Sequence, residues 1–242
     1  MFVCLALSIL LQTPPEYLVV DGIVVGRLEA SGWQPSRSIS EPITIGASEV
    51  GIAATGHQVA NVRLQSYSRG TWVEALGAPA HSVLFTGKAW TPREAGAVLD
   101  RSQLFSSVGQ FARNRGVKLP HPYLRNVWEV ELDGVGNPEQ IIEVTSNPRA
   151  GSGEPKWQAV LLRWQEKGQE RLYPLSLSFP QDGKVAQCRL RAVADFDGDG
   201  QMELVSTAIQ DSLFVATVWT FREGKLLPVV DTTVEITPIE PN

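Results

Sequence analysis

Asp195-Phe196-Asp197-Gly198-Asp199-Gly200-Gln201-Met202-Glu203 is the most informative stretch of this chain. Its four carboxylates repel one another by roughly 1–3 kcal/mol per close pair, and a bound divalent cation would remove that repulsion. The two glycines allow the backbone to curl so that carboxylates at alternate positions point inward. The stretch therefore predicts a cation-binding loop, and the alternative interpretation is an acidic turn that holds no ion.

Calcium suits such a loop because it takes about six to eight oxygen ligands in a flexible geometry. The loop is not an EF-hand, because an EF-hand has Glu at its twelfth position and the twelfth residue here is Ser206. Segments with strand character flank the loop, where an EF-hand has helices. The expected Ca2+ ligands are four carboxylates and a main-chain carbonyl, namely Asp195, Asp197, Asp199, Glu203 and the carbonyl of Gln201.

The same pattern occurs once more, 64 residues earlier (197 minus 133), where Trp128–Val144 aligns without gaps on Ala192–Ala208. Each copy reads as a strand, an acidic Gly-containing loop and a second strand. A further apolar segment and a hairpin turn follow each copy, and the two turns are Lys167-Gly168 and Glu223-Gly224. The C-terminal half of the chain, residues 121–242, therefore consists of two tandem repeats.

The acidic loop of the first copy is degenerate. Glu131 and Asp133 remain, but Val135 stands where the second copy has Asp199. We expect Asp133-Gly134 to keep the turn geometry and the site between Glu131 and Glu139 to hold no metal, because a ligand has been lost.

The second copy resembles the calcium loop of FG-GAP and VCBS-type repeats, as in integrin α-subunit propellers and many uncharacterised secreted bacterial proteins. The resemblance rests on the pattern Asp-x-Asp-Gly-Asp-Gly-x-x-Glu-Leu and covers about Trp128–Val230. It implies propeller-blade-like repeats and the same five calcium ligands, and it implies no activity. Ser206-Thr207-Ala208 follows the loop where the family often has Gly-Ala-Pro. A propeller closes with about four to eight blades, and two are visible here.

The rest of the chain predicts a mainly β protein with antiparallel sheets and one helix. Asp21-Gly22 between two β-branched runs indicates a hairpin over Tyr17–Leu28. Helical spacing of apolar residues predicts a helix near 102–115, ending at Gly116. A capping box at Thr91–Glu94 predicts a helical turn before it. Four more short strands are expected, at Ile43–Ile45, Val59–Leu64, Thr71–Ala75 and Ser82–Phe85.

The first residues suggest export. The apolar run Met1–Leu11 is too short to span a bilayer and resembles the apolar region of a secretory signal, so residues 1–13 are interpreted as a signal segment. A basic start and a clear cleavage site are missing, and a buried first strand is the alternative. Residues 14–120 would form an N-terminal β region containing the helix. We expect a secreted, periplasmic or envelope-associated protein without a transmembrane segment.

Composition and motifs narrow the range of functions expected for this chain. The net charge of -5, with mixed signs along the chain, makes nucleic acid an unexpected partner. Among common catalytic motifs, His-Glu-x-x-His, Gly-x-Ser-x-Gly and the phosphate-binding Gly-x-x-x-x-Gly-Lys are all missing from the sequence. The leading hypothesis is a non-enzymatic, calcium-binding β module that binds a protein or glycan or gives structural support. The alternative is a secreted hydrolase acting on polysaccharide, with calcium as a structural ion.

Overall fold

The computed structural model confirms a mainly β fold, with one helix and three antiparallel sheets in the part of the chain that it describes. Three sequence predictions lie outside that part: the segment 1–13, the strand Ile43–Ile45 and the capping box Thr91–Glu94. The described residues are 16–35, 49–52, 58–61, 63–66, 73–76, 83–85, 96–98, 100–118, 120–134, 136–146, 156–180 and 184–236.

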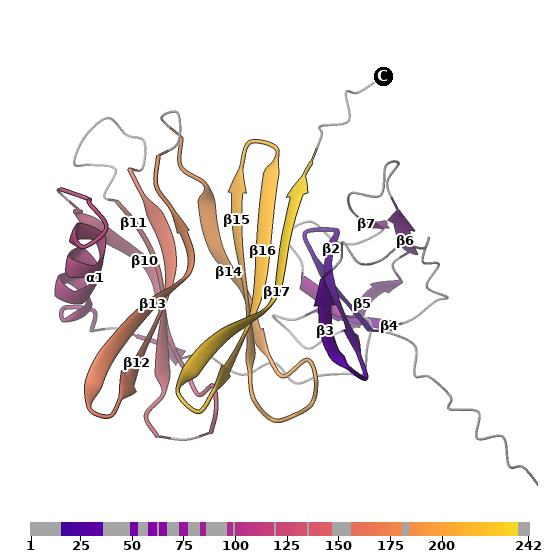
Figure 1. The fold of residues 1–242 in the computed structure, drawn as a ribbon, viewed down its shortest axis with the longest axis horizontal. Coiled ribbons are helices and arrows are strands. Elements are labelled where there is room, and N and C mark those ends of the chain that lie inside the picture. The colour runs from indigo at the N-terminus through magenta and orange to yellow at the C-terminus, as the bar shows by residue number, and fades with distance from the viewer. Residues whose placement is uncertain are drawn as a thin grey trace, which may run out of the picture.

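The molecule is a row of layers (Figure 1). Helix α1 stands at one end, followed by a five-stranded sheet in the order β13-β12-β11-β10-β9, which we call the first-repeat sheet. The second-repeat sheet, in the order β14-β15-β16-β17, comes next. An eight-stranded N-terminal sheet, made of β1–β8, stands at the other end. The described sheets therefore form an open stack, and a closed ring of blades is not seen.

The two repeats are confirmed as two antiparallel meanders. β11 (Glu139–Ser146) and β15 (Glu203–Gln210) keep the 64-residue offset at both ends. The predicted turns adopt left-handed torsions, with φ of 52° and 76° at Lys167-Gly168 and 51° and 69° at Glu223-Gly224, as two-residue hairpins require. The remaining strands are β10 (Pro122–Val130), β12 (Gln158–Glu166), β13 (Gln169–Ser178), β14 (Gln187–Ala194), β16 (Leu213–Arg222) and β17 (Lys225–Glu235).

Both repeat sheets bury both of their faces. Ile141 packs between the two repeat sheets, whereas the next residue, Ile142, packs on the side of α1. Leu204 likewise faces the first-repeat sheet and Val205 faces the N-terminal sheet. Because neighbouring strand residues point to opposite faces, burial on both sides explains why apolar residues stand next to each other in these two strands.

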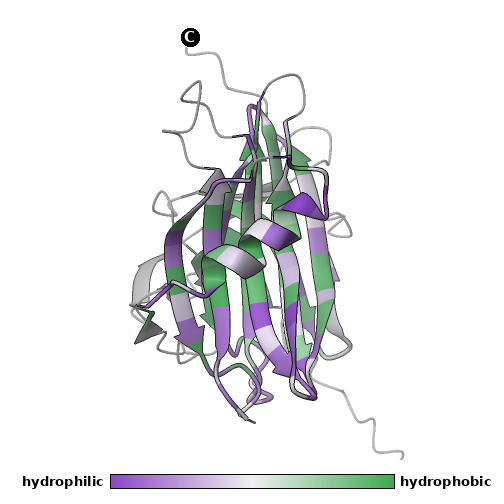
Figure 2. Cartoon of the chain, turned by 90° about the vertical axis from the view of Figure 1, so that its left-hand side faces the viewer, coloured by the Kyte–Doolittle hydropathy of each residue, from purple (hydrophilic) through white to green (hydrophobic). Residues whose placement is uncertain are grey.

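Helix α1 (Leu104–Arg113) confirms the predicted helix, with ends two residues inside the expected 102–115. Gly116 takes a φ of 89° just after the helix, as its predicted role at the C-terminal end requires. The apolar face of α1, which includes Val108 and Phe111, covers the first-repeat sheet. Figure 2 shows α1 in front of strands whose middle parts are largely hydrophobic. This helix is too short to cross a membrane.

The N-terminal sheet contains the predicted hairpin, with Asp21 and Gly22 at φ of 52° and 82° between its strands. β9 (Gly96–Ala97) pairs with β10 instead, so the chain enters the first-repeat sheet before residue 120. The strands of the N-terminal sheet are β1 (Glu16–Val20), β2 (Ile23–Glu29), β3 (Gly32–Pro35), β4 (Glu49–Ile52), β5 (Gln58–Asn61), β6 (Arg63–Ser66), β7 (Val73–Leu76) and β8 (Val83–Phe85).

Candidate metal centre

The loop between β14 and β15 gathers three of the predicted ligands. Asp195 and Asp197 lie on the loop, and Glu203 is the first residue of β15. One carboxylate oxygen of each lies within 4.8 Å of the others. We call these three residues the second carboxylate group. A single hard cation could bridge oxygens at this separation, since carboxylates bind calcium directly.

Asp195 holds the loop in its curled shape. Its Oδ1 accepts a hydrogen bond from the backbone N–H of Gly198 at 2.7 Å, and its Oδ2 accepts one from Gly200 at 2.9 Å. Both glycines have left-handed torsions, with φ of 77° and 86°. The predicted need for glycine at these two positions is therefore confirmed.

Glu203 is the fully buried member of the group, with 0% of its surface exposed. Its Oε2 accepts a hydrogen bond from the backbone N–H of Phe196 at 2.8 Å, while its Oε1 is buried without a hydrogen-bond partner. Burial raises the pKa of Glu203 to about 8, and the negative charges of Asp197 and Asp199 add to that rise. Buried polar atoms usually have a partner, so this oxygen needs either a cation or a proton.

Asp199 lies outside the group, although it was a predicted ligand. Its Oδ1 accepts a hydrogen bond from the backbone N–H of Gln201 at 2.9 Å, and its Oδ2 pairs with Arg222 at the end of β16. Arg222 Nη2 also lies 3.6 Å from Asp197 Oδ2. Burial raises the pKa of Asp197, and the guanidinium of Arg222 opposes that rise. Arg222 is thus part of the site, and sequence reasoning missed it.

Gln201, the remaining predicted ligand, contributes a buried oxygen near the end of the loop. Its side-chain Oε1 is buried without a hydrogen-bond partner, and its N–H is taken by Asp199. Coordination of an ion by its main-chain carbonyl stays a prediction.

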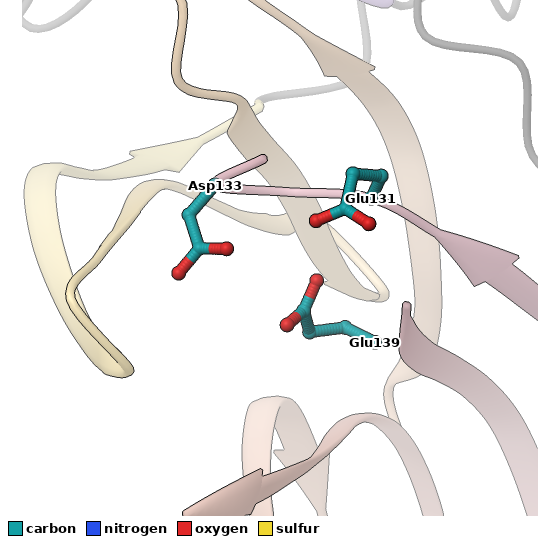
Figure 3. Close-up of side chains that lie close together, drawn as sticks. All are labelled: Glu131, Asp133 and Glu139. Atoms are coloured by element: carbon teal, nitrogen blue, oxygen red, sulfur yellow. The ribbon is translucent and has the colours of Figure 1, made fainter. Parts of the chain in front are cut away.

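The loop of the first repeat gathers an equivalent trio. Glu131, Asp133 and Glu139 each offer an oxygen within 4.8 Å of the others, and Figure 3 shows the three carboxylates turned toward one another. We call these residues the first carboxylate group. Glu139 Oε2 accepts a hydrogen bond from the backbone N–H of Leu132 at 3.0 Å, which reproduces the Phe196–Glu203 bond. The 64-residue offset that aligned the two loops in the sequence places Glu139 on Glu203.

Glu139 is buried like its counterpart, with 4% of its surface exposed. Burial raises the pKa of Glu139 to about 7, and the charges of Asp133 and Glu131 contribute to the rise. The first carboxylate group thus combines one buried carboxyl with two carboxylates on the loop, as the second carboxylate group does.

The two loops touch through their main chains. The backbone N–H of Met202, next to Glu203, donates a hydrogen bond of 3.0 Å to the carbonyl oxygen of Leu132. Leu132 is fully buried and Met202 is 3% exposed. Leu132 therefore donates to Glu139 of its own loop and accepts from the loop of the other repeat.

Comparisons of the chain with protein families, curated proteins and solved structures gave no match. The resemblance to FG-GAP and VCBS-type repeats accordingly stays a prediction, carried by the acidic motif at Asp195–Glu203 and its spacing.

Proposed function

We propose that this protein is a non-enzymatic, calcium-stabilised β module, with one ion held by Asp195, Asp197 and Glu203. The observation that carries the proposal is the carboxyl of Glu203, which is fully buried and has one oxygen without a partner. A buried carboxylate beside two others is destabilising unless a cation compensates its charge. The carboxylate oxygens gathered around it are the ligand type that hard cations prefer.

Calcium is favoured over magnesium by the form of the loop. Three carboxylates, the main-chain carbonyl of Gln201 and water would give an irregular all-oxygen shell. Calcium accepts such a shell, whereas magnesium demands a near-ideal octahedron. Extracellular calcium modules bind at about 10⁻⁴–10⁻³ M, which fits the proposed location outside the cytoplasm.

The proposed role of the ion is to order the loop between β14 and β15. These strands lie in the second-repeat sheet, which is packed on both sides. An ordered loop would fix the strand ends and present a rigid surface to a protein or glycan partner, or would stiffen an envelope structure. The ion would take no part in a reaction.

Thermal unfolding with calcium and with a chelator tests the proposal. A ligand that binds only the folded state raises the melting temperature by mass action, and a rise of several degrees is expected at millimolar calcium. Asp197→Asn should reduce that rise. Asp211→Asn is the matched control, because Asp211 is an exposed carboxylate paired with Lys184 and its loss should leave the calcium response intact. A melt that calcium does not change would contradict the proposal.

A further inference from the structure

Phe196 stands between two carboxylates of the second carboxylate group, yet its ring lies in the core shared with the N-terminal sheet. It is 4% exposed and belongs to the cluster that joins the N-terminal and second-repeat sheets. Its ring centroid lies 5.4 Å from that of Phe85 on β8 and 6.3 Å from that of Trp33 on β3, and the rings of the second pair meet at 88°. Tilted and edge-to-face pairs at these distances are favourable. The acidic loop therefore contacts the N-terminal sheet through the ring of Phe196.

The backbone of Phe196 is tied to the same three carboxylates that would hold the ion. Its N–H donates a hydrogen bond of 2.8 Å to Glu203 Oε2, and Asp195 and Asp197 are its neighbours in the chain. Because planar peptide bonds leave only two free backbone torsions per residue, a rearrangement of these carboxylates would also move the ring of Phe196.

The first repeat contains an equivalent residue. The 64-residue offset places Leu132 on Phe196, and the Leu132 N–H donates to Glu139 as the Phe196 N–H donates to Glu203. Leu132 is fully buried in the core between the two repeat sheets. Each acidic loop thus inserts an apolar side chain into the interface with the next sheet of the row (Figure 1). For the loop of the second repeat, that next sheet is the N-terminal sheet.

Contacts outside the acidic loop also hold the N-terminal sheet. Arg191 of β14 pairs with Asp21 at the turn of the β1–β2 hairpin. Thr232 of β17 donates a hydrogen bond of 2.6 Å from its hydroxyl to the carbonyl oxygen of Val25. These contacts do not depend directly on a bound ion, so the contribution of Phe196 adjusts the strength of docking and does not decide it alone.

We propose that calcium at the second carboxylate group, which we call the second site, tightens the docking of the N-terminal sheet on the second-repeat sheet through Phe196. The inference rests on the proposed function, because it uses the same ion. Repulsion among three close carboxylates opposes the curled loop, and a bound cation removes that opposition. Calcium then favours the arrangement in which the Phe196 ring lies against Phe85 and Trp33, since a ligand favours the state that it binds better.

Two NMR measurements on the ¹⁵N-labelled full chain separate binding from docking. Calcium chloride is added to the chelated protein up to about 10 mM, well above the range of extracellular modules, and the Phe196 amide should shift and saturate. Amide hydrogen exchange reports local opening, so the amides of β1 and β2 follow the docking of the N-terminal sheet, with those of β12 as the reference. Calcium should slow exchange in β1 and β2 by roughly fivefold or more relative to β12, the lower end of typical coupling between sites.

Three variants identify the side chain that carries the coupling. Phe196→Leu should remove most of the preferential slowing and weaken calcium binding several-fold, because coupling is reciprocal, while the amide at position 196 still responds. Phe214→Leu is the matched control, because Phe214 is 1% exposed in the same core cluster but lies on β16. Its preferential slowing should persist. Trp33→Leu removes the other side of the ring contact and replaces Phe196→Leu if that variant does not give a folded spectrum.

The inference is overturned if the Phe196 amide saturates with calcium while exchange in β1, β2 and β12 slows equally, because the ion then stabilises the whole fold without acting on docking. It is also overturned if the preferential slowing survives Phe196→Leu, or Trp33→Leu where that variant replaces it, or if Phe214→Leu removes the slowing as fully. A Phe196 amide that ignores calcium would instead contradict the proposed function, and this inference with it. The two failures are therefore distinguishable.

Discussion

Arg222 pairs with Asp199 at the edge of the second carboxylate group, and its Nη2 lies 3.6 Å from Asp197 Oδ2. The positive charge of Arg222 thus already interacts with carboxylates that would attract a metal ion. The Arg222 side chain is 45% exposed, so this pairing contributes on the order of 1 kcal/mol or less. A divalent cation can therefore compete with it.

Removing that competitor should strengthen calcium binding at the second site. We expect Arg222→Gln to lower the calcium dissociation constant several-fold, since about 1 kcal/mol corresponds to roughly a fivefold change. The Phe196 amide titration measures the change. Arg171→Gln is the control, because Arg171 pairs with a carboxylate in the equivalent hairpin and its side chain is 49% exposed. An affinity that stays equal or falls in Arg222→Gln would show that Arg222 does not compete.

The metal-free protein should lose stability as pH rises. Glu139 and Glu203 have pKa values of about 7 and about 8 in the folded chain, raised mainly by burial from 4.5. Between pH 4.5 and those values the folded state keeps protons that the unfolded state has released. The free energy of unfolding then falls by up to about 1.4 kcal/mol per group and pH unit. Urea unfolding with a chelator at pH 5, 6, 7 and 8 measures the slope.

Two further measurements test whether these carboxyls cause the pH dependence of the free energy of unfolding. Calcium should flatten it, because a bound cation stabilises the ionised carboxylates and binding requires their deprotonation. Glu203→Gln should also reduce it, since glutamine keeps an oxygen for the Phe196 N–H and does not titrate. A chelated protein that becomes more stable from pH 5 to pH 8 would contradict the assignment.

The interior between the two repeat sheets should be sensitive to truncation. Leu204 is fully buried there, so Leu204→Ala should lower the free energy of unfolding by about 2–5 kcal/mol through lost contacts and a cavity. Leu213→Ala removes the same atoms from a residue that is 45% exposed and should cost far less. Urea denaturation of both variants provides the comparison, and similar losses would disprove the two-sided burial of the second-repeat sheet.

Replacing a glycine of the acidic loop should destabilise the fold, because the left-handed torsion at that position is unfavourable for other residues. Gly198 has a φ of 77°, where an L-residue costs roughly 1–2 kcal/mol. Gly198→Ala should destabilise the fold by about that amount and weaken calcium binding at the second site. Gly109→Ala should stabilise by about 0.5–1 kcal/mol, because Gly109 is helical and an added Cβ meets only ordinary contacts of 3.7 Å or more. Thermal melts of the two variants measure the difference. The prediction is contradicted if both substitutions shift the melting temperature in the same direction.

Much of the local fold could be predicted because turn chemistry is a short-range property. Asp21-Gly22, Lys167-Gly168 and Glu223-Gly224 all form the expected left-handed hairpin turns, and the period of 64 placed β11 and β15 correctly. The stacking of α1 on the first-repeat sheet could not be predicted, because it depends on contacts between segments far apart in the chain. The helix also begins at Leu104 with no side-chain cap from Gln103, so its start was predicted only from the spacing of apolar residues.

The candidate site was predictable only in part. Spacing located Asp195, Asp197 and Glu203 correctly in one group, since the curled loop is set by its own residues. The position of Arg222 depends on the register of β15 against β16, in which Glu203 faces Thr220. That register puts Arg222 two residues beyond Thr220, on the same face of the strand. Spacing within the loop carries no information about Arg222, so the pairing of Asp199 with Arg222 could not be predicted.

The bond between Met202 N–H and the Leu132 carbonyl bears on how the sheets resist sliding. The hydrophobic effect that holds the two sheets together has little directional preference. A main-chain bond at the loop edge sets the offset between the sheets, because it has a defined length and angle. Shear between the two repeats would load this bond together with two others that join the same sheets, from the Leu190 N–H to Glu143 Oε1 and from the Ser206 hydroxyl to the Leu175 carbonyl.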